Sequence, residues 1–403
     1  MIARLTALRT GVSVEAHVAR SLGDGGWSWF GDPRAVFHAG RHRRTYVGWV
    51  SRDGELSVAS FDHATRHLER TILRDDLSVD DHNSPGLLMG ADGHLTVYYM
   101  GPHRAHMFYR RTKDPEDVTS WDSEQTLPTN TDGFRGYTYP NPIHLSAERR
   151  TYLFWRGGQW WPAFSRRAEG GAWSKARTIL RIPGQRPYVK FHSDGVRSIH
   201  IAYTEGNPGS FVNSLYYLRL EDDALHYADG ARVAGIDDLP LAPSAGDRVY
   251  DARPSGVRAW VWDVAARRDG RPVIVYVLLP DDSRDCTYMY AEWTGDAWHS
   301  HRIVNAGARL GHYAPGISLD HENPDVVVLS RKVGERCVIE RWRTADRGAT
   351  WHHRKINTGA LAGDSLRPIA PRHAPSERDA VWMQGRYFGY TDYRTDIVGH
   401  FSR

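Results

Sequence analysis

The chain has 403 residues, and 52 Lys and Arg against 48 Asp and Glu give a formal net charge of +4 at pH 7. Its mean hydropathy of -0.56 and its longest apolar run, Val273 to Leu279, exclude a membrane helix, which needs roughly 20 apolar residues. These values predict a water-soluble protein. The 38 Gly, 21 Pro, 15 Trp and 20 Tyr favour short strands joined by tight turns and exclude long helices as the main element.

The excess of positive charge predicts an anionic partner. The sequence pI is near 9.0, and 21 His add positive charge as the pH falls below about 7. Lys and Arg alternate with Asp and Glu instead of forming a basic stripe, which argues against nucleic acid as the partner. We expect no membrane partner either, and no feature indicates the oligomeric state.

The N-terminal stretch MIARLTALRTGVSVEAHVARSL carries arginines but lacks the apolar core of about 7 to 15 residues that a secretory signal needs. We therefore expect a cytoplasmic protein, or a secreted one if the natural chain begins further upstream. Cys286 and Cys337 are too few for a disulfide scaffold or a thiolate zinc site. Each lies in a run typical of a strand, so both are predicted to be core residues.

An internal repeat is the main signal along the chain. A pair X-Pro followed by an apolar strand recurs with prolines at 33, 85, 142, 187, 315 and 368, in steps of 52, 57, 45, 128 and 53 residues. The long step is about twice the others, and VRAWVWDVA at Val257 to Ala265 stands near its middle as a proline-free unit. The repeat therefore has seven units.

Each unit continues in the same way after its X-Pro strand. A second strand ends in aromatic residues, as in TYVGWV, LTVYYM and TYLFWR, and a third follows, as in LSVASF, HMFYRR and PAFSRR. A weaker fourth strand includes Arg70 to Leu73, Arg177 to Leu180 and Arg302 to Val304. Seven units of four strands predict an all-β, seven-bladed β-propeller with four antiparallel strands per blade.

The whole chain, residues 1–403, is expected to form this single domain. The run Val12 to Leu22 would supply the outer strand of the last blade and close the ring, which removes exposed sheet edges. Thr344 to Trp351 matches the Asp-box S/T-x-D-x-G-x-T-W of sialidase-like propellers, a hairpin turn that marks the fold and not an activity. A degenerate echo stands at Ala168 to Trp173.

In a propeller, functional groups gather where the innermost strands begin, so polar residues flanking the X-Pro strands are the candidates. His82, in the sequence DDHN, suits a general base that Asp80 or Asp81 would orient. The alternative is a turn in which these side chains only satisfy backbone groups. Asn83 is a further candidate for substrate binding.

Tyr139 and Arg156 complete the candidate catalytic set. Tyr139 precedes a proline and can give or take a proton, unless it is simply a buried, hydrogen-bonded aromatic. Arg156 follows the apolar strand TYLFW, and its planar fork suits a carboxylate, the alternative being an ion pair between blades. His103, Tyr188, His192 and Trp29 are candidate substrate contacts.

An arginine fork, a histidine and two tyrosines in one basic pocket suit a uronic acid. Pairing of its carboxylate with arginine acidifies the neighbouring carbon, so a base can remove that proton while the oxygen at C4 leaves. This β-elimination needs no cofactor, and we predict no catalytic metal.

The segments GGWSWFGDPRAVF, DDHNSP, YTYPNPIHL, YLFWRGGQWWPAFS and RPYVKFHSDGVRSIHIAYTEG resemble the BNR-repeat family that contains ulvan lyases and rhamnose–glucuronate lyases. The resemblance is strongest from Gly25 to Leu218. It implies a seven-bladed propeller lyase in which His82 and Tyr139 serve as base and acid and Arg156 neutralises the uronate. It also implies roles for His103 and Tyr188. Some relatives hold a structural metal through Cys and His. The two cysteines here are 51 residues apart in different predicted blades, so the sequence does not show where such a site would lie.

Two other functions remain open. A sialidase-like hydrolase is suggested by the Asp-box and by Arg181-Ile182-Pro183. Sialidases place this tripeptide early in the chain and need two further arginines and a tyrosine–glutamate pair, whereas here it lies mid-chain at the end of a blade. A carbohydrate-binding propeller without catalysis would use tryptophans as sugar platforms, with packing in the core as the alternative. The tryptophans concerned are Trp27, Trp29, Trp160 and Trp161.

Overall fold

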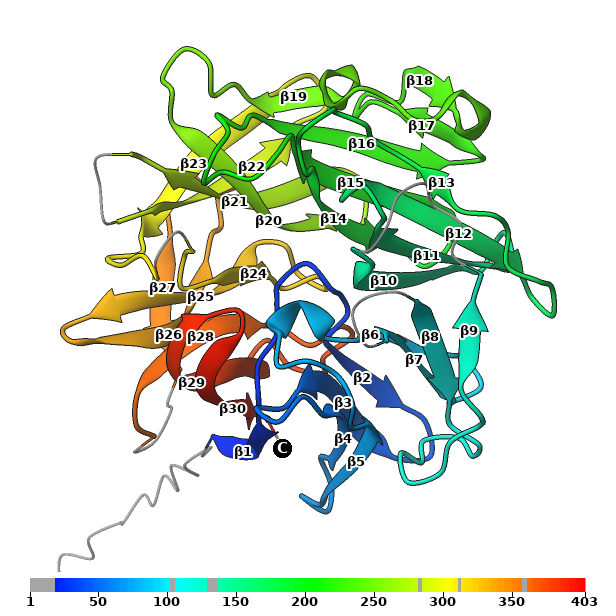
Figure 1. Ribbon diagram of the computed structural model, residues 1–403. Coiled ribbons are helices and arrows are strands. Elements are labelled where there is room, and N and C mark those ends of the chain that lie inside the picture. Colours follow the sequence, from blue (N-terminus) through cyan, green and yellow to red (C-terminus); the bar gives the residue numbers. More distant parts are fainter. Residues whose placement is uncertain are drawn as a thin grey trace, which may run out of the picture.

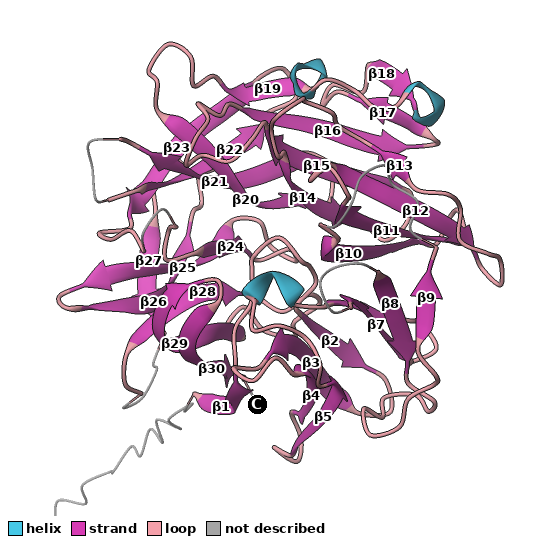
Figure 2. Cartoon of the chain, viewed as in Figure 1, coloured by secondary structure: helices cyan, strands magenta, loops and turns pink. Residues whose placement is uncertain are grey.

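The computed structural model describes residues 19–101, 106–128, 136–281, 285–310, 313–356 and 361–402. Seven antiparallel sheets follow one another around a centre, which confirms the predicted seven-bladed propeller (Figure 1). Strands and loops make up nearly all of the described chain, with only short 3-10 turns (Figure 2). None of the helices within these residues is long and apolar enough to cross a membrane.

The first strand of each blade is the innermost, and the others follow outward in chain order. The first three blades are β2 (Ala35–Ala39), β3 (Arg43–Val50), β4 (Leu56–Asp62) and β5 (Leu68–Arg74); β6 (Gly86–Met89), β7 (Leu95–Met100), β8 (Met107–Arg111) and β9 (Gln125–Leu127); and β10 (Thr138–Leu145), β11 (Arg150–Arg156), β12 (Pro162–Ala168) and β13 (Arg177–Thr178).

The fourth blade is larger than predicted. It contains β14 (Tyr188–Ser193), β15 (Ser198–Thr204), β16 (Leu215–Glu221), β17 (Ala224–His226) and β18 (Arg232–Gly235), and β19 (Asp247–Tyr250) pairs with β16. The turns η3 (Ile236–Asp238) and η4 (Pro243–Ala245) connect the last of these strands. This insertion explains the double step between Pro187 and Pro315, together with the proline-free fifth blade.

The last three blades complete the ring. They are β20 (Arg258–Ala266), β21 (Pro272–Leu279), β22 (Thr287–Trp293) and β23 (Trp298–Asn305); β24 (Ile317–Leu319), β25 (Val326–Val333), β26 (Arg336–Arg343) and β27 (His352–Lys355); and β28 (Asp364–Ile369), β29 (Ala380–Gly389) and β30 (Asp392–His400) with β1 (Arg20–Asp24).

The N-terminal strand β1 closes the seventh blade. It pairs antiparallel with β30, with Arg20 opposite Gly399 and Asp24 opposite Asp396. The strand begins later than the predicted run Val12 to Leu22, of which residues 12–18 lie outside the described part. One sheet therefore joins both ends of the chain, and β1 covers the outer edge of β30.

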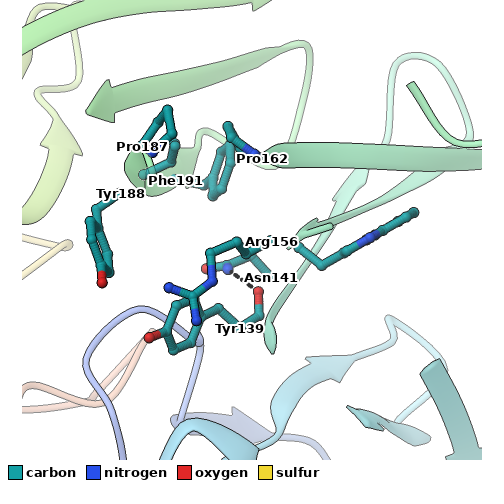
Figure 3. A pocket seen from close by; sticks show the side chains of 9 residues that line it. Tyr139, Asn141, Arg156, Pro162, Pro187, Tyr188 and Phe191 are labelled. Carbon is teal, nitrogen blue, oxygen red and sulfur yellow. Dashed lines mark hydrogen bonds between the residues drawn. The ribbon is translucent and has the colours of Figure 1, made fainter. Parts of the chain in front are cut away.

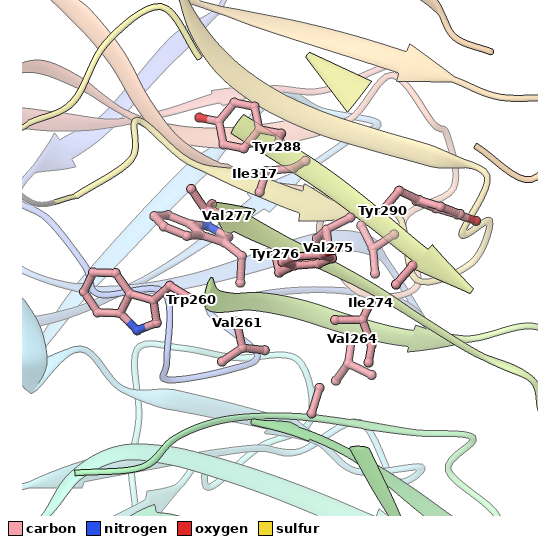
Figure 4. Close-up of a cluster of buried hydrophobic side chains, with 14 of the residues drawn as sticks. Trp260, Val261, Val264, Ile274, Val275, Tyr276, Val277, Tyr288, Tyr290 and Ile317 are labelled. Atoms are coloured by element: carbon pink, nitrogen blue, oxygen red, sulfur yellow. The ribbon is translucent and has the colours of Figure 1, made fainter. Parts of the chain in front are cut away.

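The core lies between neighbouring blades, where apolar faces of adjacent sheets pack together. Its largest cluster joins the fifth and sixth blades, with Val261, Ile274, Tyr276 and Ile317 fully or almost fully buried (Figure 4). Cys286 belongs to this cluster and Cys337 to the one between the seventh and first blades. Both thiols are free and buried, as predicted for core residues.

The Asp-box forms the turn between β26 and β27. Asp346 accepts hydrogen bonds from the backbone N–H of Thr350 (2.8 Å) and from the hydroxyl of Thr344 (2.8 Å). Gly348 has φ +94°, a conformation that favours glycine, and the indole of Trp351 donates to its carbonyl oxygen (2.9 Å). The side chains of Thr344, Asp346 and Trp351 are thus used to hold the hairpin, which confirms its structural role.

An aromatic layer lies across the centre of the ring and supports the site above it. Trp29 stacks flat on Trp262 at 4.1 Å between ring centroids and meets Trp260 edge to face at 5.0 Å. Trp27 and Trp29 are both buried, at 0% and 3% exposed. Trp29 also lines the hollow described next.

Candidate active site

The candidate site lies where the innermost strands begin, beside the turn η1 (Asp81–Asn83), which appears near the middle of the ring in Figure 1. A hollow of about 290 Å³ opens there. It brings together His82, Tyr139 and Tyr188 from the second, third and fourth blades with residues from the last blade. Its lining residues are Ser28, Trp29, Phe30, Asp81, His82, Tyr139, Tyr188, Asn207, Trp260, Tyr313, Arg367 and Tyr387.

His82 is held by both aspartates that precede it. Its Nδ1 lies 2.6 Å from Oδ1 of Asp80 and 3.2 Å from Oδ1 of Asp81, so Nδ1 carries the proton and Nε2 is left to act as a base. Asp80 also accepts from the backbone N–H of His82 (2.9 Å). The turn expected as the structural alternative therefore exists and orients the imidazole at the same time.

Burial lowers the pKa of His82, against the opposing effect of its hydrogen bond to Asp81 and the charge of that carboxylate. The positive charges of Arg156 and Arg367 add to the lowering. A lowered pKa keeps the imidazole neutral near pH 7, which is the form that accepts a proton.

Asp81 connects His82 to the far end of the chain. Arg367 donates from Nη1 to Oδ2 of Asp81 (2.6 Å) and to the carbonyl oxygen of Trp27 (2.6 Å), and the Tyr387 hydroxyl donates to the same carboxylate oxygen (2.7 Å). Burial alone raises the pKa of Asp81, but the charge of Arg367 and the hydrogen bond from His82 bring it to about 2. The carboxylate is thus ionised throughout the physiological range.

Arg367 and Tyr387 were not predicted as site residues. Arg367 stands directly before Pro368 in the X-Pro pair of the last unit. Its position beside an X-Pro strand is the only signal that the sequence offers for it. Tyr387 lies on β29 without a motif. Both line the hollow because the ring closes in space between its last and first blades.

Tyr139 lies at an irregular point of β10. Its φ is +62°, and the register of β10 against β11 shifts between Thr138 and Asn141. The amide of Asn141 donates to the carbonyl oxygens of Tyr139 (2.8 Å) and Phe30 (2.9 Å), which fixes this conformation. The side chain is turned toward His82, whose ring stacks on it at 5.4 Å between centroids.

Arg156 ends β11 beside Tyr139. Its Nε donates to Oγ1 of Thr138 (3.0 Å), and its guanidinium carbon lies 4.4 Å from the ring centroid of Tyr139, 4.7 Å from that of Trp160 and 5.5 Å from that of Tyr188. Figure 3 shows the guanidinium beside Tyr139, with Tyr188 across the hollow. This second hollow, of about 250 Å³, shares both tyrosines with the first.

No carboxylate pairs with Arg156 anywhere in the described part of the chain, although the residue is only 6% exposed. The expected alternative, an ion pair between blades, is therefore not what holds it. A buried cation normally has an anionic partner. The geometry leaves that place for a carboxylate brought by a ligand.

The other predicted contacts divide between the site and its surroundings. Tyr188 and Trp29 line the first hollow. Asn83 is buried, and its amide donates to the carbonyl oxygen (2.9 Å) and the hydroxyl (3.2 Å) of Ser78, so it supports the turn from behind. His103 lies outside the described residues.

His192 is not brought to the site. It stands four residues along β14 from Tyr188, with its Nδ1 2.8 Å from Nδ1 of His321, whose Nε2 is 3.0 Å from Oδ2 of Asp263. Asp263 therefore accepts from His321, which in turn accepts from His192. Lys190, which lies between Tyr188 and His192 on β14, is buried and donates to the carbonyl oxygen of Trp29. His192 lines neither of the two hollows.

One group of side chains has the composition of a metal site. Ligand atoms of Asp80, Asp81 and His82 lie within 4.8 Å of one another. A cation bound there would have to displace Arg367 from the Asp81 carboxylate and the proton from Nδ1 of His82. The hydrogen bonds of this group therefore fit a histidine that binds no metal. Burial raises the pKa of Cys286 and of Cys337 to about 12, which keeps both thiols protonated.

Comparison with known proteins places this geometry in a family. The model of the BNR repeat-containing family matches residues 44–306. Among solved structures, a PL25 ulvan lyase bound to GlcA(1-4)Rha3S units and a second structure of a PL25 ulvan lyase each have a TM-score of 0.71 and 14% identity, covering 96% of this chain and 95% of the other.

The polysaccharide lyase Uly1 has a TM-score of 0.54 and 12% identity, covering 98% of this chain and 95% of its own. At these identities the likeness shows the fold alone. No curated protein matches at the level of sequence.

Proposed function

The chain belongs to the BNR repeat-containing family, and we propose that it is a polysaccharide lyase that breaks the bond at C4 of a glucuronate by β-elimination. The linkage proposed is rhamnosyl-glucuronate, of the kind found in ulvan or plant gums. The observation that carries the proposal is Arg156, a buried cation without a carboxylate partner in the described chain, next to Tyr139 and close to His82.

The arrangement supplies the three groups that elimination needs. Arg156 pairs with the uronate carboxylate and stabilises the negative charge that develops on it. A base removes the proton from C5, the electron pair forms the C4–C5 double bond, and the oxygen at C4 leaves with a proton from an acid. The products are a new chain end with a hydroxyl and an unsaturated uronate.

We assign the base to His82 and the acid to Tyr139. The hydrogen bond from Nδ1 to Asp80 leaves Nε2 as an acceptor, and the lowered pKa keeps the ring neutral. A tyrosine hydroxyl is protonated below about pH 10 and can donate to the leaving oxygen. Tyr188 and Trp29, which line the same hollow, would contact the sugar.

The fold neighbours support the same class of reaction, since two of the structures reported above are ulvan lyases, one of them with a glucuronate-containing ligand, and the third is a polysaccharide lyase. Hydrolysis by a pair of carboxyl groups across the bond, the usual arrangement of glycosidases other than sialidases, is less well supported. Asp81, the carboxylate that lines this hollow, is engaged with Arg367, and Asp80 is engaged with His82.

The test is product analysis by mass spectrometry after incubation with glucuronate polysaccharides, ulvan and gum arabic among them. Elimination splits the chain without adding water and leaves an unsaturated end, whereas hydrolysis adds one water per cleavage. Unsaturated oligosaccharides support the lyase. Saturated products establish a hydrolase, and binding without any product across the panel establishes a carbohydrate-binding propeller.

A further inference from the structure

Two exposed arginines extend the basic character of the site outward from Arg156. Trp160 and Trp161 lie in the turn between β11 and β12, and both are half-buried. The guanidinium of Arg186 lies 4.9 Å from the ring centroid of Trp160, the ring that Arg156 also contacts, and that of Arg181 lies 5.2 Å from Trp161. We call Arg156, Arg186 and Arg181 the arginine strip.

The strip runs along the junction of the third and fourth blades. Arg181 follows β13, the outer strand of the third blade, and Arg186 immediately precedes Pro187 and Tyr188, where the inner strand of the fourth blade begins. The segment between them is anchored to the blades. The backbone N–H of Arg181 donates to Leu241 (2.9 Å), and the indole of Trp161 donates to the carbonyl oxygen of Ile182 (3.2 Å).

The strip lacks acidic partners. Arg181 and Arg186 are both exposed, and neither forms an ion pair within the described residues, unlike Arg177 and Arg219 on the same two blades. Two guanidinium groups on one indole repel each other unless anions lie near them. Arginine over an aromatic ring is also a preorganised fork for carboxylate or sulfate oxygens.

We propose that Arg186 and Arg181, the two outer members of the arginine strip, form a second anionic subsite, which binds negatively charged groups on the sugar residues that flank the cleaved uronate. The ligand chemistry is a carboxylate or a sulfate ester on a polysaccharide chain. This inference rests on the proposed function, which supplies the substrate. It adds that the substrate is a polyanion bound over several sugar residues, and not a short sugar with a single charge.

The test compares the double variant Arg181→Ala, Arg186→Ala with the native protein. A matched control is Arg302→Ala, Arg354→Ala, which removes two exposed, unpaired arginines from the outer strands β23 and β27. We expect the strip variant to raise KM for a sulfated glucuronate polysaccharide about tenfold, with kcat and the activity on a short uronate oligosaccharide unchanged. The control variant should behave as the native protein does.

Binding is measured separately, by electrophoresis through gels that contain the same polysaccharide, with His82→Ala added to every protein so that the polymer stays intact. The strip variant should lose retardation, and the control should not. Equal retardation of strip variant and control overturns the subsite.

Repeating the gels with the chemically desulfated polymer identifies the source of the charge. A difference between the two variants that vanishes on desulfation assigns the strip to sulfate esters, and one that persists assigns it to carboxylates. If the native protein releases no unsaturated product but the strip variant still loses retardation, the proposed function fails while the subsite stands.

Discussion

The guanidinium of Arg156 and the ring of Tyr139 lie 4.4 Å apart, on the first two strands of one blade. Pairing of β10 with β11 places Thr138 opposite Arg156, so the sheet itself positions the arginine beside the tyrosine. His82, from the preceding blade, stacks on the same ring. The proposed neutraliser, acid and base are thus held by two neighbouring blades, and each can be tested alone.

The Tyr139 hydroxyl is the proposed acid, and its removal should stop proton delivery to the leaving oxygen. Tyr139→Phe keeps the ring against Arg156 and His82, so we expect KM to change little and kcat to fall by about 10² to 10⁴. Initial rates on a glucuronate polysaccharide measure both. Tyr98→Phe is the control, because Tyr98 is a buried tyrosine that lines neither of the two hollows. Full activity of Tyr139→Phe would remove Tyr139 from the chemistry.

His82 should set the acid limb of the pH profile. Its pKa is lowered from 6.5 by burial, and a base works only when deprotonated, so activity should be lost as the pH falls through a value below 6.5. The profile of kcat/KM against pH reports this group in the free enzyme. An acid limb with its midpoint above pH 6.5 would contradict the assignment.

The sequence pattern predicts the strands that surround the site better than the hydrogen bonds between residues of different blades. The X-Pro runs correspond to inner strands of the blades, with Pro142 and Pro368 inside β10 and β28. His82 precedes one such strand, Tyr139 lies in another, and Arg156 ends the strand that pairs with it. The pairing of Asp81 with Arg367 spans 286 residues. No local pattern encodes it, since it exists only when the ring closes.

His192 was predicted as a substrate contact, but its position along β14 takes it away from the site. The two-residue period of a strand correctly puts Tyr188, Lys190 and His192 on the same side of β14. Each residue also advances about 3.3 Å along the strand, so four residues carry His192 roughly 13 Å deeper, away from the hollow. The sequence therefore predicts on which side of a strand a side chain lies more readily than how far from the hollow it lies.

The pair of Asp81 and Arg367 should be a stability element as well as a support for His82. Both side chains are almost fully buried, so removing one partner leaves an unpaired buried charge, which costs about 3 to 5 kcal/mol. We expect Asp81→Asn and Arg367→Met each to lower the free energy of unfolding by this amount in urea titrations. The double variant should lose less than the two single losses together. Additive losses would show that the pair is not coupled.

His200 should make the fold sensitive to acid. It is 1% exposed, and burial lowers its pKa to about 4. Below about pH 6.5 the unfolded chain therefore binds a proton that the folded chain does not, so stability falls as the pH drops from 6.5 toward 4. This one group accounts for roughly 3 kcal/mol over that window.

The pH dependence of unfolding in urea checks this expectation. The loss of unfolding free energy between pH 7 and pH 4.5 should be smaller in His200→Asn than in the native protein by roughly 2 to 3 kcal/mol. Comparing differences between two pH values removes any general destabilisation by the substitution. Parallel profiles for the two proteins would mean that His200 titrates normally.

The most direct test of the central claim is ultraviolet absorbance during incubation with a glucuronate polysaccharide, because elimination creates a C4–C5 double bond conjugated to the carboxylate. We predict a steady rise with the native protein and a fall in its rate by about 10² or more in Arg156→Ala, with the thermal unfolding temperature nearly unchanged. A flat trace with the native protein, or an equal rise with Arg156→Ala, would contradict the account.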